Sequence, residues 1–569
     1  MIQFDEDKQN LKLAELRRKE EEDFIKAVAA ARGIPYFNLA NVPIETDALV
    51  LIMEAEAREA QAVAFQLLNK ELGVAFVDPD NAKTESLLQG LTEKGYSVKP
   101  FLVSRRSVER AFDKYKEVSA VKETKLGSFD ISGAEIQDVG SRLRTVLDIK
   151  KEIGVILGGQ KGAKTTKIVE VILAGALAVN ASDVHLEPQQ QEVRLRLRLD
   201  GVLNDVLQID PATYNYLLSR IKLVSGVKLN VKTEAQDGRF SIKVGEFDVE
   251  VRVSVLPGSY GESVVMRILN PNALSVSMEE LGLEPRLHAL LDRELERPNG
   301  MILNTGPTGS GKTTTLYAFL KKVHKPDVKI ITIENPVEYH LPGIVQTQAD
   351  PEHGYTFSDG LRAALRQDPD IIMVGEIRDT ETAETAVAAA STGHLVFSTL
   401  HTNNAAGTFP RLLTLGVNPK VISSAVTVAM AQRLARKLCP SCKKESALGA
   451  GDKKLVKDIV NSIRLDEYKD VQQEKMWVAT GCQKCNETGY KGRIGIFEAI
   501  VMTPEIEEVI LKNPSEHEVK SAAINQNTLS MLQDGIVKAL KGVTTMDELR
   551  RVLDFENEAR SKQKNDADR

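Results

Sequence analysis

The sequence predicts an α/β protein whose central domain is a parallel sheet with helices on both faces. Between residues 290 and 436, short apolar runs alternate with segments of helical periodicity, which is typical of such a sheet. A glycine-rich loop stands between one apolar run, Met301–Leu303, and the helical segment Lys312–Val323. The strict alternation of Val193–Leu199 predicts a half-buried strand in a separate, preceding module.

Length, charge and hydropathy exclude several classes of protein. A chain of 569 residues is expected to form two to four domains. The net charge of −6 argues against broad nucleic-acid binding through a basic surface. The longest apolar stretch, near Val171–Val179, is too short to span a bilayer, and the acidic N-terminus has no signal-peptide core. We therefore expect a cytoplasmic protein that reaches a membrane only through partners.

The glycine-rich loop carries the complete phosphate-binding pattern, which runs from Gly306 through Lys312 to Thr313 between a strand and a helix. The glycines allow a tight turn in which several backbone N–H groups face one phosphate chain, and the helix start adds its positive dipole end. Lys312 supplies a positive charge to the outer phosphates, and Thr313 offers a hydroxyl to Mg²⁺. The expected nucleotide-binding residues are Gly306, Pro307, Thr308, Gly309, Ser310, Gly311, Lys312, Thr313 and Thr314.

Acidic residues near such a loop are needed to hold Mg²⁺ and to orient the attacking water. Glu334 and Glu338 follow one apolar strand, and Glu376 follows another. Gly375 stands where most P-loop enzymes carry an aspartate, so Glu376 would serve the metal through a bridging water. Each acid alone would more often be a surface charge, but acids at the ends of apolar strands beside a P-loop favour a catalytic role.

His394 and His401 stand at the two ends of the apolar segment Leu395–Leu400. We expect both at the carboxyl side of the sheet, where they would respond to the γ-phosphate. The alternative is that each is an ordinary core or surface histidine.

Residues 146–270 are expected to form a second α/β module. Besides Val193–Leu199, its strands include Val249–Val253 and Val264–Ile268, and each carries arginine. Gln236–Arg239 has the composition of a turn. Arginines on a sheet face are usually solvated, but a repeated set could meet phosphate oxygens at a subunit boundary.

The chain has four cysteines, which form the pairs Cys439-x-x-Cys442 and Cys482-x-x-Cys485. Four thiolates suit a tetrahedral Zn²⁺ ion. Disulfides or redox pairs are the alternatives, and they are less typical of a cytosolic chain. A site closed by four protein ligands would serve structure or docking and not catalysis.

Several motifs together resemble the secretion ATPases of the type II/type IV pilus superfamily, over roughly residues 30–555. The matching segments of the core are 306–313, 333–338, 374–379 and 391–403, and those of the preceding domain are 181–188 and 236–239. The resemblance implies a RecA-like ATPase domain and a homohexamer with ATP, Mg²⁺ and Zn²⁺. Each nucleotide would lie between the RecA-like domain and the preceding domain.

The resemblance also implies roles for individual residues. Glu338, with Glu334 nearby, would orient water, and Glu376 would fill the Walker B position. Asn335 departs from the family pattern, which has aspartate there, but we expect activity to survive because the glutamates carry the role. The candidates for arginines that reach phosphate are Arg239, Arg252 and Arg267.

The expected organisation has seven segments. The first α/β domain shows no phosphate loop, and we find no paired leucine-rich motifs of the kind that bind a cyclic dinucleotide, so a docking role is the default. The segments are a charged helix at 1–33, a first α/β domain for partner docking at 34–116, a linker at 117–145, an arginine-bearing PAS-like domain at 146–270, the RecA-like core at 271–436, a tetracysteine zinc subdomain at 437–495 and C-terminal helices at 496–569.

The function that this resemblance implies is a motor that hydrolyses ATP to power type IV pilus assembly through an inner-membrane platform protein. The alternative is a type II secretion motor, and a second alternative is a nucleotide-sensing scaffold, which Asn335 would favour. Retraction motors lack both the first module and the cysteines. Direct binding of nucleic acid is not expected.

Overall fold

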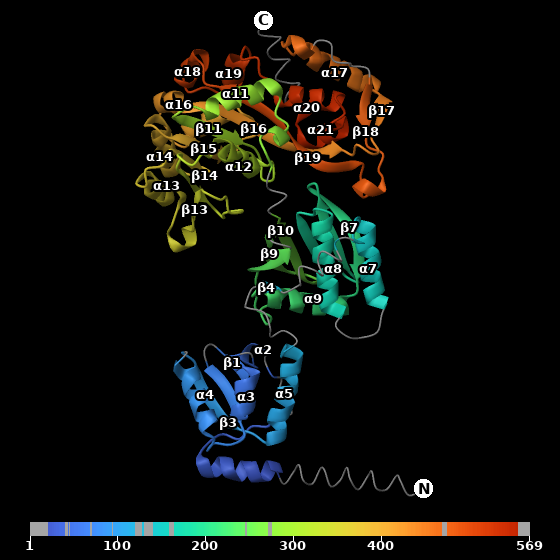
Figure 1. Cartoon of the computed structure of the whole chain (residues 1–569), viewed down its shortest axis with the longest axis vertical. Helices are drawn as coiled ribbons and strands as arrows, with labels where there is room; N and C mark the ends of the chain where they lie inside the picture. Colours follow the sequence, from blue (N-terminus) through green and yellow to red (C-terminus); the bar gives the residue numbers. More distant parts are fainter. Residues whose placement is uncertain are drawn as a thin grey trace. The chain divides into compact units, whose positions relative to one another are not determined.

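A computed structural model of the chain divides into two compact units, Met1–Lys125 and Leu126–Arg569 (Figure 1). Most of the predicted linker, the start of the predicted N-terminal helix and the end of the chain lie outside the residues that the structure describes. The described residues are 21–39, 44, 46–49, 51–68, 71–93, 95–119, 128–129, 140, 142–158, 164–244, 247–270, 276–468 and 475–555.

The first unit is a small α/β domain. Strand β2 pairs with β1 antiparallel and with β3 parallel. Its core holds a cluster of aromatic rings, in which Phe65 lies 5.1 Å from Phe37 and 5.5 Å from Phe101 between ring centroids. The elements are β1 (Ala62–Leu68), β2 (Glu71–Phe76), β3 (Ser97–Leu102), α2 (Thr46–Leu49), α3 (Glu54–Ala60), α4 (Ala82–Glu93) and α5 (Arg105–Ser119), after a helical segment at 21–32.

The second unit begins with a seven-stranded sheet of order β4-β8-β9-β10-β5-β6-β7. All neighbours in it are antiparallel except β4 and β8. In β6 the Val and Leu side chains are buried and the arginines between them are half-buried, as the alternation predicts. The elements are β4 (Ser128–Phe129), β5 (Asp183–Pro188), β6 (Val193–Leu199), β7 (Val202–Ile209), β8 (Gln236–Val244), β9 (Phe247–Gly258), β10 (Gly261–Leu269), α7 (Val146–Gly158), α8 (Lys164–Ala178) and α9 (Pro211–Val224).

The turn expected at Gln236–Arg239 is wrong, because these residues open strand β8 and pair with β9. Gly238 occupies a close approach instead of a turn. A Cβ atom there would lie 2.3 Å from the carbonyl oxygen of Ser225, so no larger residue fits without a shift of backbone.

The P-loop core contains a second seven-stranded sheet, of order β13-β12-β14-β15-β11-β16-β19. Every pair in it is parallel except β16 and β19. The strands are β11 (Gly300–Thr305), β12 (Ile330–Glu334), β13 (Val345–Gln348), β14 (Ile371–Val374), β15 (Leu395–Leu400), β16 (Val426–Leu438) and β19 (Tyr490–Val501).

Both faces of this sheet are covered. In β11, Met301 and Leu303 belong to one buried cluster and Ile302 to another, so successive side chains enter different cores. The strand–helix alternation therefore predicts this layered fold correctly. The helices are α11 (Pro285–Leu295), α12 (Lys312–Val323), α13 (Phe357–Leu365), α14 (Thr380–Ser391), α15 (Thr408–Thr414) and α16 (Pro419–Ala425), with 3₁₀ turns η2 (Glu279–Leu281) and η3 (Pro351–His353).

The cysteine-bearing segment lies between the long strands β16 and β19, which pair from Val428 opposite Val501 to Leu438 opposite Tyr490. It contains a two-stranded ladder of β17 and β18. Its elements are β17 (Lys444–Ala447), α17 (Ala450–Asn461), η4 (Asp466–Tyr468), β18 (Lys475–Val478) and η5 (Gln483–Cys485), and the chain continues into α18 (Pro504–Ile510), α19 (Glu516–Ala523), α20 (Met531–Leu540) and α21 (Met546–Val552).

Candidate functional site

Four parallel strands end together at one edge of the core sheet, which we call the catalytic edge and define as the carboxyl ends of β11, β12, β14 and β15. The register places Thr305 opposite Leu400, Ile333 opposite Val374, and Val374 opposite Ser398. The residues that follow these strands therefore converge. Ligands bind at the carboxyl ends of strands in open α/β sheets, so this edge is the candidate nucleotide site.

The phosphate loop connects strand β11 to helix α12, which are both labelled in Figure 1. Gly306 and Gly311 have φ angles of +150° and +89°. A Cβ atom on either would lie 2.6 or 2.9 Å from an atom of Gln432, so both positions need glycine for space as well as for conformation. The loop thus presses its backbone against strand β16.

Lys312 and Thr313 lie at the start of α12. The Lys312 ammonium donates to the carbonyl oxygens of Gly306 and Pro307, at 2.7 and 3.1 Å, and so lies over the loop. Burial lowers the pKa of Lys312, while the negative charge of Glu376 opposes that shift. Thr313 is exposed in the first turn of the helix, where its hydroxyl is accessible to a Mg²⁺ ion.

Glu376 lies at the catalytic edge and is held from two sides. Its Oε2 lies 3.1 Å from Nε2 of His401, and its Oε1 lies 2.6 Å from the guanidinium of Arg378. The preceding residue, Gly375, approaches β12 closely, since a Cβ atom there would lie 3.3 Å from the carbonyl oxygen of Ile333. Glu376 and His401 therefore form one polar pair beside the phosphate loop.

Glu334 is 3% exposed at the end of β12. Its carboxylate accepts hydrogen bonds from the hydroxyl of Tyr317, from Thr332 Oγ1 at 2.5 Å and from Gln346 Nε2 at 3.1 Å. Burial raises the pKa of Glu334, and its three hydrogen-bond donors oppose that rise. Such a carboxylate is already saturated and enclosed, which fits a structural role better than the orientation of a water molecule.

Glu338, four residues further on, has the opposite environment. Its side chain is 35% exposed, and its Oε2 lies 3.6 Å from Nη1 of Arg252. Arg252 also donates from Nη2 to the carbonyl oxygen of Val337 at 3.0 Å. We call residues 335–338 the catalytic loop. Strand β9 of the preceding domain thus reaches the catalytic loop through one arginine.

The three predicted arginines lie side by side across the preceding domain's sheet. Arg239 in β8 pairs in register with Arg252 in β9, which pairs with Arg267 in β10. Arg239 is exposed, and it makes no ion pair within the described residues. Arg267 donates to Asp183 Oδ1 at 3.0 Å. The strand pattern therefore assembles one arginine row, of which Arg252 contacts the catalytic loop.

His394 does not join His401. It precedes β15 at the amino edge of the sheet, where its carbonyl oxygen accepts from the amide of Gly300 and its Nδ1 lies 3.1 Å from the carbonyl oxygen of Ala389. The six residues of β15 lie between the two histidines, so their Cα atoms are about 20 Å apart. The expectation that both lie at the carboxyl side is wrong for His394, because the strand between them spans the sheet.

The four cysteine sulfurs form one cluster, with all ligand atoms within 4.8 Å of one another. Three of the S···S distances are 3.9 Å (Cys439–Cys482), 3.8 Å (Cys442–Cys485) and 3.7 Å (Cys482–Cys485). A tetrahedron of thiolates around Zn²⁺ at 2.3 Å has edges of about 3.8 Å. The cysteines are therefore spaced to hold a zinc ion, and all four are free of disulfides.

Residues 479–492, which we call the metal loop, are shaped by turns. Five residues in it have positive φ angles: Gly481, Asn486, Glu487, Gly489 and Gly492. The amides of Cys482 and Gly489 each lie 3.2 Å from the sulfur of Cys485. Such N–H···S contacts stabilise a thiolate and fix its orientation toward a metal.

Comparison with known proteins gives two family matches. Residues 160–551, well over half of the chain, match the family described as Type II/IV secretion system protein. The chain belongs to this family. Residues 32–120 match the MshEN domain.

Two relatives cover most of the chain. The type IV pilus assembly ATPase PilB of Myxococcus xanthus is 38% identical over 518 residues, which make up 91% of this chain and 88% of that protein. The type II secretion system ATPase E of Vibrio cholerae is 39% identical over 464 residues, 80% of this chain and 90% of that protein. As a member of this ATPase family the chain is an ATPase, and the predicted α/β architecture with a P-loop ATPase domain is confirmed.

No sequence motif of this secretion ATPase indicates Gln432. Its buried amide oxygen accepts from Asn304 Nδ2 at 2.9 Å and from Thr315 Oγ1 at 2.8 Å, so it ties β11 and α12 together behind the phosphate loop. In the sequence, Gln432 can be recognised as a single polar residue that follows the mainly apolar run Val426–Ala431. Nothing local connects it to the P-loop, because the contact forms between strands far apart in sequence.

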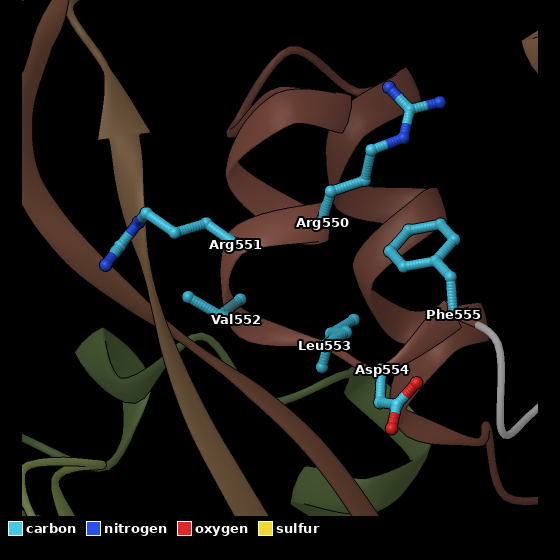
Figure 2. A pocket seen from close by; sticks show the side chains of 6 residues that line it. All are labelled: Arg550, Arg551, Val552, Leu553, Asp554 and Phe555. Carbon is cyan, nitrogen blue, oxygen red and sulfur yellow. The ribbon is translucent and has the colours of Figure 1, made fainter.

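A shallow hollow lies away from the catalytic edge, at the end of α21 (Figure 2). Figure 2 shows the side chain of Arg551 pointing away from those of Arg550 and Phe555. Arg550 pairs with Asp452, and Arg551 with Glu548, so both charges are already satisfied. We assign no site to it. Across the part of the chain that the structure describes, no helix combines the length and the apolar composition needed to cross a membrane.

Proposed function

We propose that this ATPase is the motor of type IV pilus assembly, which acts as a homohexamer at the inner face of the cell membrane on an inner-membrane platform protein. The supporting observation is the extent of similarity: the pilus assembly relative matches 91% of the chain, and the type II secretion relative matches 80%. The longer match favours pilus assembly because it takes in more of the chain outside the ATPase core.

In the proposed site, the N–H groups of the phosphate loop and Lys312 bind the phosphates of ATP, and Thr313 contributes its hydroxyl to Mg²⁺. Glu376, held by His401, faces the metal side through water. Glu338 orients the attacking water, and it is the more exposed of the two glutamates of its motif. Mg²⁺ and the phosphate contacts supply electrostatic stabilisation of the transferred phosphoryl group.

The contact between Arg252 and the catalytic loop supports a role for the preceding domain in turnover. Arg252 lies against Val337 and Glu338, so movement of its domain would move a positive charge toward or away from the reacting phosphate. Closing and opening of the two domains during the ATP cycle would transmit force to the partner. We propose Arg239 and Arg267 as further phosphate contacts across a subunit boundary.

The four cysteines are proposed to hold one structural zinc ion per chain. The seven predicted segments, from the helix at 1–33 to the C-terminal helices at 496–569, stay part of this proposal. The first α/β domain would dock partners of the assembly complex.

A deletion strain tests the machine that the motor serves. We expect loss of surface pili with normal export of secreted enzymes, and restoration of pili by the wild-type gene. Loss of export with normal piliation would instead establish the type II secretion alternative, which the relative that is 39% identical supports. If both processes persist while the purified chain binds ATP and does not hydrolyse it, the scaffold alternative would replace the motor.

A further inference from the structure

The domain that precedes the core touches the metal loop as well as the catalytic loop. The amide of Val146 donates to Asn486 Oδ1 at 2.8 Å, and the amide of Gly492 donates to Asp200 Oδ2 at 2.8 Å. Val146 and Asp200 belong to the preceding domain, and Asn486 and Gly492 belong to the metal loop. The two hydrogen bonds run in opposite directions between the same two parts of the chain.

Asn486 is placed for this contact by its position in the loop. It follows Cys485 directly and has a φ of +52°, a conformation that asparagine tolerates better than most residues. Its backbone amide donates to the carbonyl oxygen of Gln483, and its side chain extends from the loop toward Val146. The position of its amide oxygen therefore depends on where the Cys485 sulfur is held.

Asn486 accepts a hydrogen bond from a backbone amide at the start of a helix. Val146 is the first residue of α7, and such an amide has no partner within its own helix. The backbone amides of Thr145 and Asp148 have partners nearby, because each donates to the side chain of the other residue. Asn486 thus completes the cap of a helix in another domain.

Asp200 fixes the second contact. It lies in the turn between β6 and β7 with a φ of +49°, and its carboxylate accepts from Gly492, whose φ is +79°. Both partners are therefore held by tight turns. A charged acceptor makes this hydrogen bond stronger than one between neutral groups.

A row of residues in register connects the strand before this turn with Arg252. In register, Arg252 of β9 lies opposite Arg267 of β10, which lies opposite Asp183 of β5, which lies opposite Arg198 of β6. Asp183 is buried and binds Arg267 at 3.0 Å and Arg198 at 3.1 Å. Strands β9 and β6 are three positions apart, or about 14 Å. One rigid sheet therefore bears both the metal-loop contact and the catalytic-loop contact.

We propose that the metal loop is the docking point of the preceding domain, and that Asn486 and Asp200 are positioning residues that hold Arg252 against the catalytic loop. Attachment at two separated points prevents the sheet from turning about either one. The cysteine cluster thereby affects ATP turnover without touching the nucleotide. This inference rests on the proposed function only for its effect on turnover, because the docking contact itself is measured without ATP.

Four variants of the full-length chain distinguish loss of the docking contact from general destabilisation of the protein. Asn486→Ala removes the acceptor of Val146, whereas Asn486→Asp keeps an oxygen there. Asn513→Ala is the matched control, since Asn513 is exposed and has a φ of +58°, so it carries the same backbone strain. Asp200→Ala breaks the second contact from outside the metal loop and should leave zinc content unchanged.

Hydrogen exchange without nucleotide is the first measurement. We expect the start of α7 to exchange about fivefold faster in Asn486→Ala, and the segment around Gly492 to do so in Asp200→Ala. Asn486→Asp and Asn513→Ala should match wild type. Wild-type exchange in both contact variants, or an equal change in Asn513→Ala, would overturn the proposal.

Steady-state kinetics is the second measurement. We expect kcat to fall about fivefold in Asn486→Ala and in Asp200→Ala with little change in KM for ATP, because the phosphate loop is untouched. Asn486→Asp should restore kcat. Faster exchange with an unchanged kcat would show that docking does not position Arg252, and would also overturn the proposal.

Discussion

The catalytic edge and the metal loop are both built from short motifs that are easy to see in the sequence, but they are held in different ways. At the catalytic edge, parallel strands in register deliver Thr305, Glu376 and His401 to one place. In the metal loop the backbone follows a series of turns with positive φ, and the sulfurs are brought together from two separate segments. The first geometry follows from the sheet itself, whereas the second is the geometry that a metal ion shared by the four sulfurs would hold together.

The two regions therefore differ in the substitutions that they tolerate. A side chain at the catalytic edge that is not buried can be replaced without loss of the strand that carries it, so its variants report on chemistry. The metal loop has no such support, so its variants report on structure first. Substitutions in the two regions are therefore expected to have different consequences.

The largest effect is expected for Lys312→Ala. The Lys312 ammonium donates to two loop carbonyl oxygens, and in the proposed site it supplies the charge that faces the phosphates. ATPase activity should fall by more than about a hundredfold, while the thermal unfolding midpoint stays near wild type. Lys322→Ala, on the same helix and paired with Asp292, is the control and should retain activity. Substantial turnover in Lys312→Ala would refute the phosphate-loop assignment.

The two glutamates of one motif should separate chemistry from stability. Glu338→Gln should bind ATP and hydrolyse it about a hundredfold more slowly, with an unchanged free energy of unfolding. Glu334→Gln replaces a saturated acceptor by a group that also donates, and should lower the free energy of unfolding by about 1–3 kcal/mol. ATPase assays and urea titration of both variants distinguish the roles. If Glu334→Gln alone abolished turnover at wild-type stability, the roles would be reversed.

Metal removal should affect the metal loop and spare the phosphate loop. Metal analysis of the purified chain should find about one zinc per chain. Treatment with a chelator should accelerate hydrogen exchange in residues 437–495, while binding of a fluorescent ATP analogue persists. Absence of zinc in freshly purified protein would contradict the metal assignment. Loss of nucleotide binding on chelation would show that the two regions are not independently held.

A smaller effect is expected for Glu548 on helix α21. Although burial opposes ionisation, hydrogen bonds from Arg551 and Arg436 lower the pKa of Glu548 to about 2. A depressed pKa contributes stability that is present above the ordinary value of about 4.5 and is lost as pH falls toward 2. Glu548→Gln should therefore lose about 2 kcal/mol of stability at pH 7 and show a flatter stability profile in that window.

The matched control for that profile is Asp547→Asn. Asp547 is the neighbouring acid on α21, and its side chain is 91% exposed. Its replacement should leave both the stability at pH 7 and the pH profile close to wild type. Equal profiles for the two variants would show that the pairing of Glu548 with Arg436 does not stabilise strand β16.

Contiguous motifs could be recognised in the sequence without knowledge of the fold. The phosphate loop, the strand before Glu376 and the cysteine pairs were found because each lies within a few residues of chain, and their chemistry follows from residue type and spacing. The layered sheet was predicted because strand and helix periods alternate through residues 290–436. These features need no knowledge of distant contacts.

The tertiary structure decided which of those residues meet. The register of β15 separates His394 from His401, and burial behind α12 removes Glu334 from the exposed site that Glu338 occupies. The contact of Gln432 with Asn304 in β11 and that of Asn486 with Val146 join segments that are more than a hundred residues apart. The chemical groups and the local elements that carry them can be predicted from the sequence, because both depend on neighbours along the chain. Their pairing depends on strand order and register, which are set by the packing of the whole sheet.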